Sequence, residues 1–477
     1  MNEIYYSSIE EIHRLYKEKK LTVRSLVMAY LSRIAEIDKC KDGLNSVLET
    51  NPDVLFIADE FDERLKKGEE PRALFGIPVL LKDNVNTKDR LHTSAGSVAL
   101  ADNYAPYDAH IVKNLRQAGA VILGKANMTE FANFMTRENM PSGYSSRGGQ
   151  VINPHKRDET PSGSSSGSGV ATAAGLCTVS IGTETSGSIV SPAAYNGIVG
   201  IKPTMGLVGR SGIIPIASTL DTAGPMTRTV RDAAILLGAI AGHDPDDPAT
   251  HTRDSAKVKD YLQCLDPNGL KGLSIGIDRF HETDESKLNE EGRNAFDNIC
   301  KVLSNAGAVI KDNVNLDYSP SSIKIMRYEF KACMNYYLST LSGNSSVKTL
   351  DGIIKFNQEH AAVALKYGQS LLLDCQNNTS GTMTETEYLQ LLAEREKTIA
   401  AFDKIFDDNS IDVILCEGFP RIAPFTGFPS MSIPIGRRKD NLPIGSYWIA
   451  RRFDEGILLK AAYAVEQLLG LNLQPIP

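Results

Sequence analysis

Residues 162–191 read SGSSSGSGVATAAGLCTVSIGTETSGSIVS and contain nine serines and six glycines in thirty positions. A segment of this composition is typical of a flexible linker. However, residues 170–176 and 179–181 are apolar and regularly spaced, as expected for a helix and a strand. We therefore predict that this segment is folded and is not a flexible linker.

The surrounding sequence alternates between short apolar runs and amphipathic stretches. The run 75–81 is apolar on both faces and predicts a buried strand that ends at Lys82-Asp83-Asn84. This alternation is typical of βαβ units and predicts a largely parallel sheet covered by helices. The other predicted helices are an N-terminal helix capped by Ser8, a helix capped by Thr22, and 52–67, 109–118, 166–176 and 457–469; the other predicted strands are 120–123, 178–182, 412–415 and 430–434.

Charge and cysteine content exclude several classes of protein. The net charge of −7 argues against a nucleic-acid-binding surface, which usually carries a basic excess. The seven cysteines are scattered and form no C-x-x-C pair, so we expect no disulfide framework and no cysteine zinc site. The apolar runs are shorter than the roughly 18 residues that span a bilayer. These features predict a cytoplasmic chain that binds neither nucleic acid nor membrane.

Three familiar nucleotide or hydrolase motifs match only in part. Residues 119–126 have the spacing of a phosphate-binding loop, but Ala126 lacks the hydroxyl that binds magnesium, so we expect a helix–strand turn. A dinucleotide fingerprint fails where Thr172 replaces the last glycine. Residues 163–167 match the G-x-S-x-G nucleophile elbow at Ser165, but the polar segment before them does not predict a strand.

The chain has eight histidines and no clustered histidine motif, so a serine nucleophile would need another base. Lys82 follows a buried strand, where catalytic groups of α/β sheets tend to lie. The ordinary pKa of a lysine is about 10.4. Lys82 can act as a base at pH 7 only if burial lowers this pKa by roughly 3, which corresponds to destabilising the charged form by about 4 kcal/mol. The local sequence also fits a surface lysine at a strand end.

The ordered set of motifs resembles the amidase signature family. The resemblance covers most of residues 70–245 and a short segment near the C-terminus. It implies an α/β fold with a large, mixed, mostly parallel sheet covered by helices on both faces. The motifs that carry it are Lys82-Asp83-Asn84, Gly163-Ser164-Ser165-Ser166-Gly167-Ser168, Gly182-Thr183-Glu184-Thr185-Ser186-Gly187-Ser188-Ile189, Gly200-Ile201-Lys202-Pro203-Thr204, Leu220-Asp221-Thr222-Ala223-Gly224-Pro225 and Gly427-Phe428-Pro429-Ser430.

The resemblance assigns roles to specific residues. It implies that Ser188 is the acylated nucleophile, Ser164 the bridging serine and Lys82 the base. It also implies a cis peptide bond between Gly163 and Ser164. The implied oxyanion hole consists of backbone N–H groups of Thr185, Ser186, Gly187 and Ser188. No metal or other cofactor is implied.

Four positions depart from the common family pattern: Ser162, Glu184, Ser186 and Val190. Val190 replaces an arginine that is frequent in the glutamine-hydrolysing subunit of tRNA-dependent amidotransferases. The loss of this arginine weakens the case for that subunit. Residues 182–192, 330–331, 350–357 and 367–369 instead resemble the peptide-amidase-type branch. The implied function is hydrolysis of R–CO–NH₂, with C-terminal peptide amides as candidate substrates. Two alternatives remain: a catalytically silent binding protein, and an amidotransferase subunit that supplies ammonia to a partner.

The length of 477 residues allows two or three ordinary domains or one large α/β unit. The resemblance favours one amidase domain over 1–477. Its parts would be N-terminal helices (1–70), the signature core (71–245), a variable helical region (246–405) and C-terminal elements that complete the core (406–477). We expect a small-molecule or peptide amide as the binding partner, and a monomer or homodimer.

Overall fold

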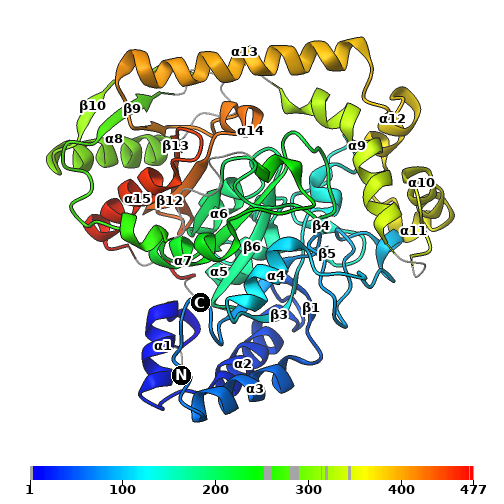
Figure 1. The fold of residues 1–477 in the computed structure, drawn as a ribbon, viewed down its shortest axis with the longest axis horizontal. Helices are drawn as coiled ribbons and strands as arrows, with labels where there is room; N and C mark the ends of the chain where they lie inside the picture. Colours follow the sequence, from blue (N-terminus) through cyan, green and yellow to red (C-terminus); the bar gives the residue numbers. More distant parts are fainter. Residues whose placement is uncertain are drawn as a thin grey trace.

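A mixed sheet runs through the centre of the protein in the computed structural model (Figure 1). The structure describes residues 4–251, 260–279, 289–312, 314–316, 321–341, 345–471 and 473–475. In this part of the chain the sheet has eleven strands in the order β1-β3-β2-β6-β8-β7-β12-β13-β11-β9-β10. The strands are β1 Val47–Thr50, β2 Pro78–Lys82, β3 Val121–Ala126, β6 Val179–Glu184, β7 Val199–Lys202, β8 Thr222–Thr227, β9 Ser274–Asp278, β10 Val309–Lys311, β11 Val413–Cys416, β12 Ser430–Arg437 and β13 Pro443–Ala450; a small separate ribbon pairs β4 Tyr144–Ser145 with β5 Gly149–Gln150.

The predicted mixed sheet is confirmed: in the described residues four of its ten neighbouring strand pairs are parallel, in two blocks, and the other six are antiparallel. Strand β2 lies between β3 and β6 and is parallel to both, and β9 is likewise parallel to β10 and β11. The strands between these blocks, and β1 at the edge, pair antiparallel. One reason is that β12 and β13 are joined by only residues 438–442, and so short a connection can join only antiparallel strands.

Helices cover the sheet and extend beyond it. In Figure 1, α1, α2 and α3 (blue) lie together at the lower end of the view, and the long α13 runs along the top. The helices are α1 Ile9–Lys17, α2 Val23–Arg33, α3 Val54–Lys66, α4 His110–Gln117, α5 Ser166–Ala173, α6 Val190–Asn196, α7 Val230–Ile240, α8 Glu290–Asn305, α9 Ser322–Thr340, α10 Leu350–Glu359, α11 Ala361–Ala364, α12 Ser370–Asn378, α13 Thr386–Asn409, α14 Ile422–Thr426 and α15 Glu455–Leu469, with a π-helical turn at Ile34–Asp38 and short 3-10 turns at Ile4–Tyr6, Val98–Leu100, Glu130–Asn133, Pro248–His251 and Tyr261–Cys264.

Two helix starts follow the predicted capping residues. Ser8 caps α1 by accepting from the Glu11 N–H, and Thr22 forms a reciprocal capping box with Ser25 at the start of α2.

None of the described helices is both long enough and apolar enough to cross a bilayer.

The strand expected at 75–81 begins and ends later than predicted. Residues 72–77 form turns instead, in which the Phe75 N–H donates to Arg72 O and the Ile77 N–H to Leu74 O, both at 2.9 Å. The strand is therefore Pro78–Lys82. Lys82 is its last, fully buried residue rather than the first residue of the following loop.

The Ser/Gly-rich composition of residues 162–191 allows α5 to pack closely against the neighbouring strands. Every residue of α5 is buried. A side chain at Gly167 would place its Cβ 2.2 Å from Asn127 O and 2.3 Å from Ser46 O, so only glycine lets α5 approach this closely. The buried hydroxyls are satisfied across the interface with β6, because Ser168 Oγ donates to Ile181 O and Ser180 Oγ donates to Ser168 O, both at 3.0 Å.

Candidate active site

Lys82 lies at the carboxyl end of β2 with no solvent-exposed surface. Its Nζ donates to Ser164 Oγ at 2.8 Å, to Ser165 Oγ at 2.9 Å and to the main-chain oxygen of Thr183 at 3.0 Å. These bonds reach the start of α5 and the end of β6. Because β2 and β6 are parallel neighbours, three distant parts of the sequence meet at this edge of the sheet.

The environment of Lys82 favours its neutral form. Burial lowers the pKa of Lys82 from 10.5 to about 7, although the negative charges of Glu184 and Asp221 act in the opposite direction. The three hydrogen-bonded oxygens are neutral and supply no compensating charge. The lowered pKa that a lysine base requires is thus present in the structure.

Ser164 follows a cis peptide bond with Gly163, as predicted from the family resemblance. A Cβ on Gly163 would lie 2.6 Å from Thr129 Oγ1, so this position has room only for glycine. Ser162, one of the four departures, has a φ of 57°, in the left-handed region that glycine adopts most readily. A glycine in related sequences would therefore suit the backbone conformation at this position.

Ser188 lies in the tight connection between β6 and α6, preceded by Gly187 with a φ of 92°. A Cβ on Gly187 would lie 2.9 Å from the ring of Phe419. The Ser165 N–H donates to Ser188 O at 3.2 Å and so ties the two serine-bearing segments together. Among the described residues, no hydrogen bond joins the Oγ atoms of Ser188 and Ser164.

The four N–H groups expected to form an oxyanion hole have no acceptor in the described part of the chain. They belong to Thr185, Ser186, Gly187 and Ser188. The next two N–H groups, of Ile189 and Val190, donate to Glu184 Oε2 at 2.7 and 3.1 Å. This segment therefore presents adjacent unused donors, which can stabilise a developing negative charge.

Sequence reasoning missed two contributions to the site. Ser165, considered only as an elbow nucleophile, is a buried partner of Lys82, and its Oγ also donates to Thr183 O at 3.1 Å. The polar segment 154–161 before it forms no strand, as expected. Asp221 accepts a hydrogen bond from Thr185 Oγ1 at 2.5 Å. Its motif was recognised, but nothing in the sequence shows that it meets Thr185.

The near-match to a phosphate-binding loop at 119–126 is confirmed as a helix–strand turn, because β3 occupies Val121–Ala126. In the described residues, no three His, Cys, Asp or Glu side chains form a group that could hold a metal ion.

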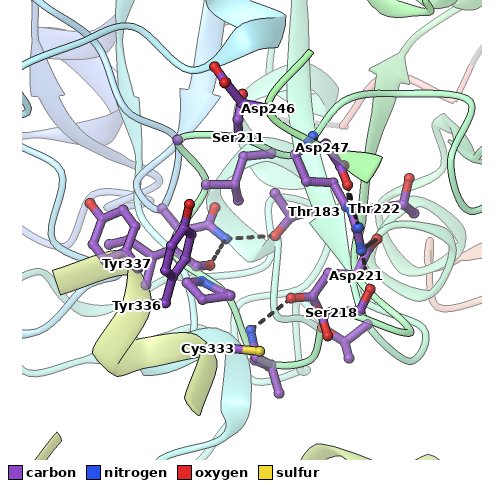
Figure 2. A pocket seen from close by; sticks show the side chains of 18 of the residues that line it. Thr183, Ser211, Ser218, Asp221, Thr222, Asp246, Asp247, Cys333, Tyr336 and Tyr337 are labelled. Atoms are coloured by element: carbon purple, nitrogen blue, oxygen red, sulfur yellow. Dashed lines mark hydrogen bonds and ion pairs between the residues drawn. The ribbon is translucent and has the colours of Figure 1, made fainter. Parts of the chain in front are cut away.

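A cavity of about 520 Å³ lies beside the end of β6 and is lined by Thr183, Glu184 and Thr185. Figure 2 shows Tyr336 and Tyr337 of α9 on one side of it, and Ser218, Asp221 and Thr222 on the other. The cavity therefore borders the segment that carries the unused N–H groups.

Comparisons with known proteins agree with this arrangement. Residues 25–424 match the Amidase family. The chain belongs to the amidase family. A probable amidase of Arabidopsis thaliana is 38% identical, over 99% of this chain and 92% of the relative. A glutamyl-tRNA(Gln) amidotransferase subunit of Alkaliphilus metalliredigens is 35% identical, over 97% of this chain and 96% of the relative.

Among solved structures, the native peptide amidase of Stenotrophomonas maltophilia superimposes with a TM-score of 0.91 at 38% identity, covering 98% of each chain. The amidase signature fold is thus confirmed, and the chain lies close to the peptide-amidase-type branch. The protein is an amidohydrolase that acts on linear amides.

The lowered pKa of Lys82 predicts a pH-dependent stability change in Lys82→Met. The folded protein binds the Lys82 proton only below about pH 7, whereas the unfolded chain binds it up to pH 10.5. The energetic cost of burying Lys82 is therefore full below pH 7 and disappears as the pH rises to 10.5. Relative to wild type, the free energy of unfolding of Lys82→Met should be higher at pH 6.5 than at pH 9 by about 2–3 kcal/mol. Denaturant unfolding at both pH values measures this difference, and an equal effect at both would contradict the lowered pKa.

Proposed function

We propose that the protein hydrolyses carboxamides, R–CO–NH₂, to the acid and ammonia through an acyl-enzyme on Ser188. The observation that carries this proposal is the 2.8 Å hydrogen bond from the buried amine of Lys82 to Ser164 Oγ. A serine hydroxyl is a weak nucleophile unless a base accepts its proton. Neutral Lys82 supplies that base at physiological pH, and Ser164 lies where it can relay the proton.

The proposed reaction has two steps. In the first, Ser188 Oγ attacks the amide carbon while its proton passes through Ser164 to Lys82. The carbonyl oxygen becomes an oxyanion, held by N–H groups of the segment Thr185–Gly187 and of Ser188 itself. The C–N bond then breaks, and the leaving nitrogen takes the proton from Lys82 through Ser164 to depart as ammonia.

Water completes the cycle by attacking the acyl carbon while its proton passes to the same relay. The bond between the acyl carbon and Ser188 Oγ then breaks, the relay returns the proton to Ser188 Oγ, and the acid leaves. The relay requires Ser188 Oγ to come within hydrogen-bond reach of Ser164 Oγ in the substrate complex. Catalytic hydrogen bonds commonly tighten on substrate binding.

C-terminal peptide amides are the substrates we propose. The similarity to the peptide amidase of Stenotrophomonas maltophilia, over 98% of both chains, supports this class. Val190, in place of the arginine frequent in amidotransferase subunits, also supports it. The similarity to the Alkaliphilus metalliredigens amidotransferase subunit keeps glutamine hydrolysis as the second candidate function.

We further propose that residues 1–477 act as one cytoplasmic catalytic domain, as a monomer or homodimer. The continuous eleven-stranded sheet of the described residues, with β1 and β10 at its edges, contains strands from both the N-terminal and the C-terminal parts of the chain and supports a single domain. The seven cysteines are all free, which supports a reducing compartment.

A serine-reactive fluorophosphonate should label the wild-type protein on the peptide that contains Ser188. Ser188→Ala should lose the label and at least about 10³-fold of the ammonia release, because the attacking group is absent. Ser339→Ala, which removes an exposed hydroxyl on α9, is the control and should behave as wild type. Labelling that persists in Ser188→Ala, read by peptide mass spectrometry, would refute the assignment.

A panel of peptide amides, aryl amides, fatty amides and glutamine separates the candidate functions. We expect the purified chain alone to release ammonia fastest from peptide amides. Rapid glutamine hydrolysis that appears only after a tRNA-binding partner is added would instead identify an amidotransferase subunit.

A further inference from the structure

We propose that Asp221 is a positioning residue which holds the oxyanion-binding segment in place through the hydroxyl of Thr185. This proposal rests on the proposed function, because it assigns a role within the same site. Thr185 is the first residue after β6, and its Oγ1 donates to Asp221 Oδ1 at 2.5 Å. This bond commits the hydroxyl proton to Asp221, so that Thr185 acts as an anchor point for the segment.

The segment needs such an anchor because its own N–H groups make no hydrogen bonds in the described structure, and its main chain is held at the far end, where Gly187 O and Ser188 O accept from the N–H groups of Ser191 and Ser165. The N–H groups of residues 185–188 have no acceptor, which leaves them available to substrate. At the far end, Glu184 holds the N–H groups of Ile189 and Val190. At the near end, the hydrogen bond from Thr185 Oγ1 to Asp221 holds the segment in the same way. The carboxylates of Asp221 and Glu184 thus hold the two ends of the segment that carries the unused N–H groups.

The position of Asp221 follows from strand pairing. Strands β6 and β8 are antiparallel, and their last paired residues are Glu184 and Thr222. Thr185 and Asp221 come next on each strand and therefore lie opposite each other. The side-chain hydrogen bond between Thr185 and Asp221 continues the pairing of the two strands at the point where main-chain pairing ends. Beyond this point residues 185–188 leave the sheet and form the site.

Asp221 is itself fixed by its neighbours. Its Oδ2 accepts the N–H groups of Ile216 and Ala217 at 2.8 and 3.0 Å, and its own N–H donates to Ala217 O at 2.9 Å. Figure 2 shows Asp221 beside Ser218 on one wall of the cavity. The residues 216–221 therefore form a closed turn around this carboxylate.

The same turn is attached to the helices that cover this side of the site. Buried Glu329 of α9 accepts from Thr219 N at 3.0 Å, from Thr219 Oγ1 at 2.7 Å and from Ser218 Oγ at 3.1 Å. Its Oε1 also accepts from Tyr388 OH of α13 at 2.9 Å. The turn that carries Asp221 is thus held from the helical region, which gives Thr185 a rigid acceptor.

The decisive variant is Thr185→Val, which removes the hydroxyl and preserves the shape of the side chain. We expect kcat to fall about 10–100-fold with KM changed less than about 3-fold, because misaligned donors weaken only transition-state stabilisation. Thr185→Ser restores the hydroxyl and should recover kcat to within about 3-fold of wild type.

A peptide trifluoromethyl ketone gives a second readout. Ser188 Oγ adds to its carbonyl carbon, the C=O π electrons become an oxyanion, and the serine proton passes to Lys82. Its affinity should fall in Thr185→Val by about the same factor as kcat/KM. The corresponding methylene compound, which forms no oxyanion, should bind equally to both proteins.

Ser46→Ala is the matched control, because Ser46 Oγ donates at the same 2.5 Å to the buried Asp38, at the start of β1 and away from residues 183–188. It should lower the melting temperature and leave kcat and ketone affinity unchanged. The proposal is overturned if Thr185→Val keeps wild-type kcat, or if it behaves like Ser46→Ala. Failure of the proposed function would appear separately, as loss of the Ser188 assignment in the labelling experiment.

Discussion

The buried amine of Lys82 is the constraint on which the rest of the site depends. A lysine in the interior, hydrogen-bonded to three neutral oxygens, is costly when charged, and its pKa is lowered to about 7. That cost is what makes Lys82 a useful base near neutral pH. The three acceptors must also come close to one point at the end of β2. The chain achieves this with β6 on one side and, on the other, the start of α5, which is built from serine and glycine.

The Ser/Gly-rich composition of residues 162–191 therefore allows main-chain segments to approach one another closely, and does not serve to make the chain flexible. Gly167 lets α5 approach the strands, and Gly187 leaves room for Phe419 beside the nucleophile. The serines of this segment have two different structural roles. Ser168 and Ser180 satisfy buried main-chain oxygens, whereas Ser164 and Ser165 face the amine of Lys82. A composition typical of a linker thus produces a closely packed, buried part of the protein.

Much of this arrangement could be predicted from the sequence, because its signals are local. The cap at Thr22, the buried strand that ends at Lys82 and the α5–β6 unit follow from periodicity and turn chemistry. The family motifs added the cis bond, which the structure contains, and the catalytic roles, which stay predictions for this chain. The missed features depend on contacts between distant residues. The insertion of β12 and β13 between β7 and β11, and the meeting of Thr185 with Asp221, arise from strand order that no local pattern encodes.

The central claim, that neutral Lys82 draws the proton from Ser188 through Ser164, is tested most directly by the pH dependence of acylation. Single-turnover formation of the acyl-enzyme should be measured from pH 5 to pH 9. Because Lys82 acts as a base only when neutral, the rate should fall about tenfold per pH unit below its pKa of about 7 and level off above it. The rising limb should be absent from the residual activity of Lys82→Met. An acylation rate that is flat between pH 5 and pH 9 in the wild-type enzyme would contradict the account.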